Sequence, residues 1–205
     1  MGHRQMTDRF GPAEPVLPLV DLSGIQTGDA LAMPWPETDC IIGNPPFLGS
    51  QHLRGARGDT YIDWLKSTFK VGVKDYCVYW FRRAHNHLKP GQRAGLVGTN
   101  SISQNRARSA SLEYVVANDG VITDAVSSQK WPGEANVHVS LVNWVKRPAS
   151  PPPAFTLDGA AVTGITPELR SPERSTGEVA RLAANKGQVL PGSDPRRRRF
   201  HHHGR

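Results

Sequence analysis

The residues with the clearest chemical potential form the segment Asn44-Pro45-Pro46-Phe47, which directly follows the apolar run of residues 39–43. Neither proline has an N–H group and both fix φ, so the turn is rigid and its carbonyl oxygens have few local partners. The Asn44 side chain adds another acceptor, and Phe47 adds a flat apolar ring. Two acceptors beside an aromatic ring suit an amino group on a planar heterocycle. The alternative is an ordinary turn after a strand, because Asn-Pro commonly initiates turns.

Five further residues have side chains that suit a ligand or nucleic-acid site: Asp29, Arg54, Arg57, Lys130 and Trp131. Asp29 follows a glycine, so its carboxylate could either accept a hydrogen bond from a ligand or cap a helix or turn. Arg54 and Arg57 are expected in a Gly-rich loop, where they could contact phosphates or form a solvated face. Lys130 suits a phosphate contact. Trp131 could be a core residue, but the Pro-Gly pair after it favours an exposed loop.

The spacing of apolar residues predicts the elements that position these groups. Short apolar runs and period-two alternation predict strands, and apolar residues at helical spacing predict helices. Strands are expected at residues 25–31, 39–43, 94–98, 121–126 and 137–145, and helices at 61–69, 77–88 and 105–118, the last with Leu112, Val115 and Val116 inward. This order predicts an open, mostly parallel α/β sheet whose last strand is an antiparallel edge strand. Ligands bind beyond the carboxyl ends of strands in such sheets, which is where Asn44 lies.

The charge and composition restrict the classes of protein. The net charge is +7, but five arginines lie in residues 196–205, and the rest of the chain has 20 basic against 18 acidic residues. The charge alone therefore does not establish nucleic-acid binding. No apolar run is long enough to span a membrane, and the N-terminus lacks the pattern of a secretory signal. Two cysteines give no disulfide framework and fit a reducing cytoplasm.

The combination of motifs resembles a known family. Residues 39–47 look like motif IV of the S-adenosylmethionine-dependent amino-methyltransferases, and Asp75-Tyr76 and residues 95–102 and 131–140 extend the likeness. Together they resemble adenine-N6 DNA methyltransferases, particularly the MmeI-like type IIL restriction–modification class, over about residues 16–195. The same four-residue motif occurs in protein-glutamine methyltransferases, which the 131–140 segment disfavours. The resemblance implies a partial Rossmann-like class I methyltransferase fold.

The resemblance also implies roles for individual residues. Asp29 would accept from the adenine amino group of S-adenosylmethionine, and Asn44 and Pro45 would accept from the amino group of the target adenine. Pro46 completes that motif, and Phe47 and Trp131 would stack on the target base after it flips out of double-stranded DNA. Methyl transfer would be a direct displacement that depends on alignment and on these acceptors. No metal is expected.

Two expected family segments are missing from residues 1–43: the glycine-rich cofactor motif and the acidic residue that binds ribose. The chain therefore resembles a truncated catalytic domain at residues 1–147, followed by a Pro-rich linker and connector at 148–195 and a basic tail at 196–205. We expect one side of the strand at 39–43 to be exposed and the isolated chain to bind S-adenosylmethionine weakly or not at all. Two alternatives stay open: a non-catalytic DNA-binding remnant, or half of a split methyltransferase completed by an upstream polypeptide.

Overall fold

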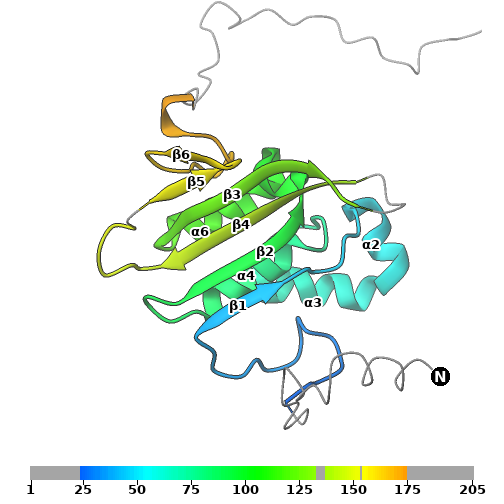
Figure 1. Cartoon of the computed structure of the whole chain (residues 1–205). Coiled ribbons are helices and arrows are strands. Elements are labelled where there is room, and N and C mark those ends of the chain that lie inside the picture. The colour runs from blue at the N-terminus through cyan, green and yellow to red at the C-terminus, as the bar shows by residue number, and fades with distance from the viewer. Residues whose placement is uncertain (1–23, 133–136, 153, 175–205) are drawn as a thin grey trace, which may run out of the picture.

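A computed structural model describes residues 24–132, 137–152 and 154–174. Within them a six-stranded sheet has the order β1-β2-β4-β3-β5-β6. The strands are β1 (Cys40–Gly43), β2 (Arg93–Thr99), β3 (Gly120–Lys130), β4 (His138–Lys146), β5 (Phe155–Leu157) and β6 (Ala160–Val162) (Figure 1). The helices are α2 (Ser50–Arg57), α3 (Asp59–Phe69), α4 (Val78–His87), α5 (Asn105–Ala110) and α6 (Leu112–Ala117), with 3-10 turns η1 (Asn100–Ser103) and η2 (Pro172–Arg174). The mixed α/β architecture confirms the expected fold class, although three of the five strand pairings are antiparallel.

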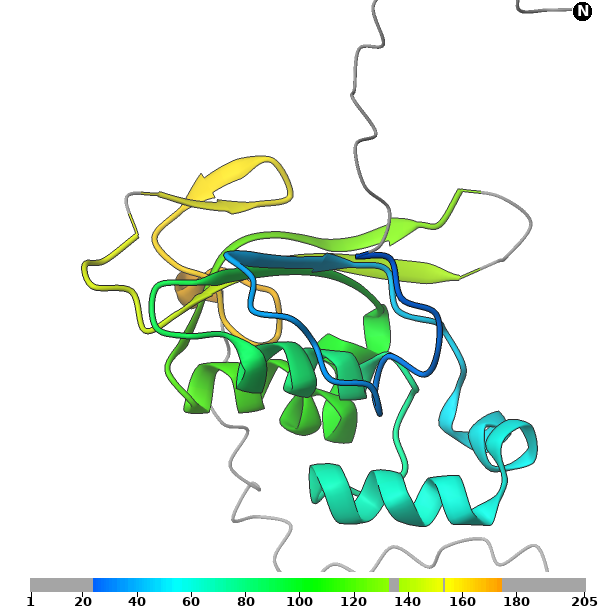
Figure 2. The same cartoon turned by 90° about the horizontal axis from the view of Figure 1, so that it is seen from below.

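The described helices lie on one face of the sheet (Figure 2). The core between them joins α4, α5 and α6 to the inward residues of β2, β3 and β4. Trp144 of β4 stacks on Phe81 of α4, with ring centroids 5.6 Å apart and planes at 21°. A second cluster joins α3 to α4 through Ile62, Leu65 and Tyr79. These residues follow the helical spacing seen in the sequence, because one stripe of each helix is apolar.

The antiparallel strand expected at the edge lies inside the sheet instead. β4 pairs antiparallel with β2 on one side and with β3 on the other. Val139, Val142 and Val145 are all buried, although Asn143 is exposed. A period-two pattern predicts a strand but does not say which neighbour lies on each side. The antiparallel strand at the sheet edge is β6, which the sequence analysis did not anticipate.

Three local expectations were wrong. Residues 25–31 do not form a strand, because Asp29 begins a turn in which Ala32 N and Met33 N both donate to its carbonyl oxygen at 2.9 Å. The helix expected at 105–118 is two helices, separated at Ser111 by φ −118° and ψ −92°. Val116 is 39% exposed rather than inward.

The sheet also continues past residue 147, where the sequence analysis places a Pro-rich linker. β5 pairs parallel with β3, and β6 pairs with β5. Leu169 is buried in the main core. Residues 154–174 therefore pack as part of the same unit. The tail at 196–205 and residues 175–195 of the connector lie outside the described residues. No described helix is long and apolar enough to span a membrane.

The strand that precedes the Asn44 segment has one open side. β1 pairs parallel with β2, in the register Ile42 to Gly95, and it is the first strand in the order of the described sheet. Ile42 is 85% exposed, and Cys40 is exposed as well. The expectation that one side of this strand is exposed is therefore confirmed.

Candidate functional site

The segment of Asn44 to Pro46 lines a cleft of about 660 Å³ at the carboxyl end of β1. Asp29 and Arg57 line the same cleft, so it brings together five residues singled out in the sequence. Pro45 is buried and the Asn44 side chain is exposed. The rigid Pro-Pro pair thus holds the turn in the protein while the Asn44 amide faces solvent.

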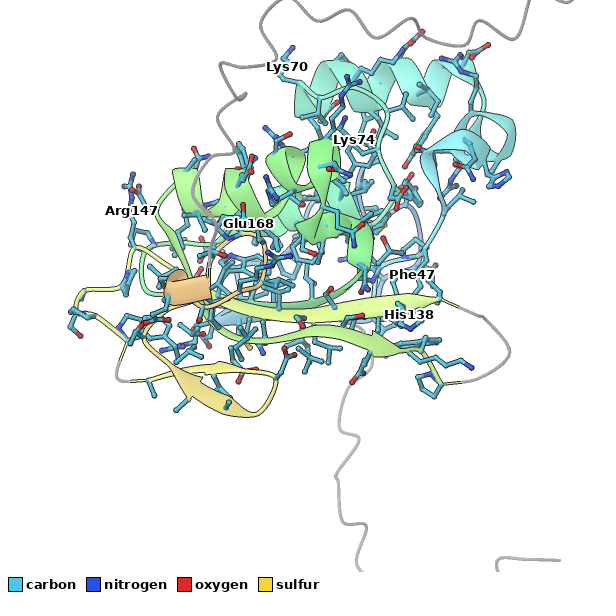
Figure 3. All side chains as sticks on the ribbon, turned by 90° about the horizontal axis from the view of Figure 1, so that it is seen from above. Phe47, Lys70, Lys74, His138, Arg147 and Glu168 are labelled. Atoms are coloured by element: carbon cyan, nitrogen blue, oxygen red, sulfur yellow. The ribbon has the colours of Figure 1, made fainter. Side chains whose placement is uncertain are left out.

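Phe47 lies beside Trp131, although the two residues follow different strands. Their ring centroids are 5.7 Å apart and their planes meet at 89°. The backbone N–H of Trp131 donates to Val137 O at 2.9 Å, a bond that links the chain after β3 to the chain before β4. Lys130 is exposed and pairs with His138 in the sheet register. Figure 3 places Phe47 and His138 at the same end of the sheet. The expected aromatic pair and its neighbouring lysine therefore share one end of the sheet.

Asp29 is held by a chain of hydroxyl contacts that the sequence analysis missed. Its Oδ1 accepts from Leu31 N at 2.9 Å, and its Oδ2 accepts from the Tyr61 hydroxyl. The Tyr61 and Tyr76 hydroxyl oxygens are 2.7 Å apart, and Arg57 Nη2 donates to the Tyr76 hydroxyl at 2.7 Å. Burial, reinforced by the hydrogen bond to Asp29, raises the pKa of Tyr61. Tyr61 therefore stays protonated and acts as a donor to the carboxylate.

Arg54 and Arg57 lie on α2 rather than in the expected Gly-rich loop. The Arg57 guanidinium carbon lies 5.1 Å from the centre of the Tyr61 ring and 5.2 Å from that of Tyr76, so both rings are within cation–π range. Arg54 forms an ion pair with Asp59. Arg57 thus has structural contacts beside the cleft, while Arg54 is tied to the start of α3.

Asp75, at the start of the α4 region, fixes the loop that carries the motif. Its Oδ1 accepts from Ser50 N at 3.1 Å, and its Oδ2 accepts from Ser101 Oγ at 2.6 Å. The next residue, Tyr76, donates its N–H to Leu48 O at 2.9 Å. The segment after Phe47 is therefore tied to the end of β2 and to α4. The pattern Asp75-Tyr76 was visible in the sequence, but these partners were not.

The segment that carries Asp29 is anchored on α4. Arg83 Nη1 donates to Leu31 O at 2.6 Å, and Nη2 donates to Met33 O. The Arg83 guanidinium also lies 4.8 Å from the centre of the Trp35 ring. Asp29 thus occupies a fixed position on the wall of the cleft.

The two cysteines differ in their environments. Cys40 is exposed and lines the cleft, whereas Cys77 is buried. Burial raises the pKa of the Cys77 thiol to about 11. The described residues include no group of three or more His, Cys, Asp or Glu side chains that could hold a metal ion.

Comparison with known proteins identifies similar domains. The family described as the DNA-methyltransferase domain of MmeI matches residues 2–151. No curated protein matches the chain. Among solved structures, the type IIL restriction–modification enzyme MmeI, determined in complex with DNA, is similar with a TM-score of 0.61 and 21% identity; the match covers 82% of this chain. The chain spans 25% of the MmeI chain.

Two further solved structures match over smaller parts. A putative class I S-adenosylmethionine-dependent methyltransferase from Listeria monocytogenes gives a TM-score of 0.46 at 13% identity, over 62% of this chain and 39% of that one. The M protein of the type I restriction enzyme EcoKI gives a TM-score of 0.42 at 15% identity. That match covers 55% of this chain and 21% of the M protein chain.

Proposed function

The chain belongs to the family of MmeI DNA-methyltransferase domains, and on this premise we propose that it serves site-specific methylation of adenine N6 in double-stranded DNA, with S-adenosylmethionine as the methyl donor. One observation carries the proposal. The Asp29 carboxylate and the Asn44-Pro45 acceptors line the same cleft at the end of β1. Phe47, the last residue of the motif, contacts the ring of Trp131 beside it.

The cleft fits the adenosine part of the donor. Its volume of about 660 Å³ lies within the range typical of small-molecule sites. Ile41 and Trp80 provide apolar surface, and Asp29 provides an oriented acceptor for an exocyclic amino group. When bound, S-adenosylmethionine supplies an electrophilic methyl group on a positively charged sulfur.

The acceptors at the motif suit an amino nitrogen whose lone pair is delocalised into a ring. The Asn44 side-chain oxygen and the Pro45 carbonyl would each accept one N–H bond of the flipped adenine. Both bonds favour a pyramidal nitrogen, which directs the lone pair out of the ring plane. Fixed acceptors also stabilise the positive charge that develops on this nitrogen. Because their rings are perpendicular, one of Phe47 and Trp131 would stack on a face of the base and the other would border its edge.

The open side of β1 suggests how the cofactor site is completed. Ile42 projects with 85% exposure from a strand that has one partner in the described sheet. An additional strand paired there would cover Ile42 and bring its own carboxyl end, with a glycine-rich turn, to the cleft. An upstream polypeptide is the source of that strand that the test below examines, and it would make this chain one part of a split catalytic unit. The same open side supports the second candidate, a DNA-binding remnant without catalysis.

The test is transfer of labelled methyl from S-adenosylmethionine to unmethylated duplex DNA. The arms contain the purified chain, its Asn44→Ala variant, and each of these with the polypeptide encoded upstream. The modified nucleoside is identified by mass spectrometry after digestion of the DNA. We expect N6-methyladenine only when the upstream polypeptide is present, and none with Asn44→Ala.

The other outcomes are equally informative. Signal from the chain alone that Asn44→Ala abolishes contradicts the split unit but retains the site. Signal that survives Asn44→Ala, or a different methylated nucleoside, contradicts the assigned chemistry. Absence of methyl transfer in every arm, with DNA binding retained, favours the DNA-binding remnant without catalysis.

A further inference from the structure

A second cleft, of about 890 Å³, lies beside the loop that carries the Asn44 segment. Its lining includes Ser50 and Asp75, which are hydrogen-bonded to each other at 3.1 Å and fix that loop. Most of the remaining lining comes from η1, α5 and the residues between them, which follow the carboxyl end of β2. Both clefts therefore open near the carboxyl ends of neighbouring parallel strands.

The charged groups of this second cleft are not equally engaged. Asp75 accepts from Ser50 N and from Ser101 Oγ, and Glu113 accepts from Arg108 Nε at 2.6 Å. In contrast, Lys74 and Arg106 form no ion pair with another described residue. The two carboxylates are thus occupied within the protein, while two cations remain for an external anion.

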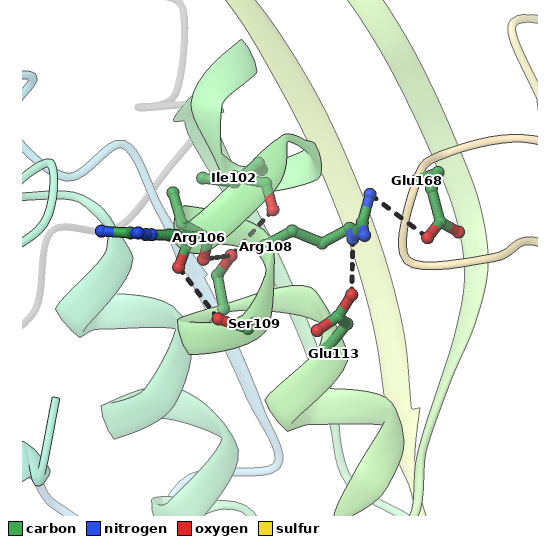
Figure 4. Close-up of polar contacts among 8 residues, drawn as sticks. Ile102, Arg106, Arg108, Ser109, Glu113 and Glu168 are labelled. Carbon is green, nitrogen blue, oxygen red and sulfur yellow. Dashed lines mark hydrogen bonds and ion pairs between the residues drawn. The ribbon is translucent and has the colours of Figure 1, made fainter. Parts of the chain in front are cut away.

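Arg106 projects from a helix that is anchored at several points. Arg108 joins Glu113 at 2.6 Å and Glu168 at 3.3 Å, which ties α5 to α6 and to the loop after β6 (Figure 4). The Ser111 hydroxyl is 2.8 Å from both Ile102 O and Ala107 O. Figure 4 shows Arg106 extending away from this ion-pair cluster. Binding through Arg106 therefore requires little ordering of the backbone.

We propose that this second cleft binds backbone phosphates of the DNA strand whose base enters the Phe47–Trp131 pair. The inference rests on the proposed function and adds a location for the strand beside the flipped base. A flipped base stays covalently attached to its own backbone, so the phosphates next to it must lie near Phe47. Lys74 and Arg106 would neutralise them, and the exposed amides of Gln104 and Asn105 are neutral donors of the kind that contact phosphate oxygens.

The test measures binding of the full chain to fluorescently labelled duplex DNA at a series of NaCl concentrations. Each lost phosphate contact lowers the slope of log affinity against log salt by about 0.9. We expect that decrease for Arg106→Ala and about twice that decrease for Lys74→Ala/Arg106→Ala, on every DNA sequence alike. Arg93→Ala is the matched control, because it removes the same charge from the opposite end of β2. The arginine-rich tail is present in every variant and cancels in the comparison.

An unchanged slope in Arg106→Ala, an equal decrease in Arg93→Ala, or no binding of DNA by the unsubstituted chain at low salt would overturn the inference. A calorimetric titration with inorganic phosphate separates a backbone site from a site for free phosphate. Binding of phosphate alone that Arg106→Ala removes, without a change in DNA binding, also overturns it. Methyl transfer by the Asn44→Ala variant tests the proposed function separately, since that substitution leaves Lys74 and Arg106 in place.

Discussion

The rings of Phe47 and Trp131 meet edge to face at a centroid distance of 5.7 Å, although they follow strands that are not neighbours in the sheet. Phe47 follows β1 and Trp131 follows β3, with β2 and β4 between those strands. The close approach requires both the rigid motif turn and the hairpin that Trp131 N and Val137 O close. A pair of perpendicular rings can offer one face to a planar base and use the other ring to border its edge.

Replacing Trp131 with alanine should lower kcat/KM for methyl transfer about 5- to 150-fold, since stacking of a base on an aromatic side chain is worth about 1–3 kcal/mol. Trp131→Phe keeps a ring face and should retain most of the activity. The measurement is methyl transfer in the active arm of the assay, with 2-aminopurine fluorescence at the target position as a report on stacking. Equal activity in the alanine and phenylalanine variants would contradict a stacking role.

Tyr61→Phe should weaken the cofactor site while leaving the fold intact. The change removes one hydroxyl, and with it the hydrogen bonds to Asp29 and Tyr76. Each such bond contributes about 0.5–1.5 kcal/mol, so the melting temperature should fall by a few degrees. The KM for S-adenosylmethionine should rise more than the KM for DNA, because Asp29 loses a donor that orients it.

The matched control is Tyr114→Phe. It removes a hydroxyl that donates to Asn86 Oδ1 over 2.7 Å, and neither residue lines the cleft. That variant should change neither KM. A rise in the KM for DNA alone in Tyr61→Phe would show that Asp29 does not serve the cofactor.

Thiol labelling should modify Cys40 and spare Cys77 in the native chain. Cys40 is exposed on β1, whereas Cys77 is buried and has its pKa raised to about 11 by burial. Reaction with a maleimide followed by mass spectrometry should show one adduct, which Cys40→Ser abolishes. Addition of the upstream polypeptide should slow the labelling, because a strand paired with β1 covers its edge. Unchanged labelling in a methyl-transferring mixture would place the additional strand elsewhere.

Acidification should destabilise the fold through His85. Trp144 Nε1 donates to His85 Nδ1 at 3.2 Å, and His85 Nε2 lies 2.8 Å from Asn118 O, so the neutral ring uses both nitrogens. Burial lowers the pKa of His85 below its ordinary value of 6.5. The unfolded chain then binds the proton more readily than the folded one, so this contribution to stability is complete above pH 6.5 and is lost as the pH falls below it.

Urea unfolding between pH 5 and pH 8 measures this effect. His85→Gln should flatten the pH dependence in the acidic range, whereas His87→Asn, on the same helix, should leave it in place. The same slope in the wild type and in His85→Gln would exclude His85 as the titrating group.

Local sequence signals were sufficient for the elements that carry the motif. The apolar run before Asn44 and the helical spacing of Ile62 and Leu65 predict β1 and α3, because strand and helix periods depend on near neighbours. The Asn44 segment could be recognised for the same reason, since its turn is built from adjacent residues. The break at Ser111 had no such signal, because its hydroxyl bonds to the distant Ile102 carbonyl as well as to its own helix.

The sequence by itself determined the strand β1 and the turn after it, and it singled out Asn44 and Asp29 as the groups to which the proposal assigns binding roles. Only the tertiary structure decided that β4 lies between β2 and β3, that β5 extends the sheet, and that Tyr61 holds Asp29. These relationships join residues far apart in the chain. The free energy that stabilises them comes from strand pairing and from burial, which are gained only when the distant segments meet. Periodicity reports which face of an element is apolar, but it carries no information about which distant element covers that face.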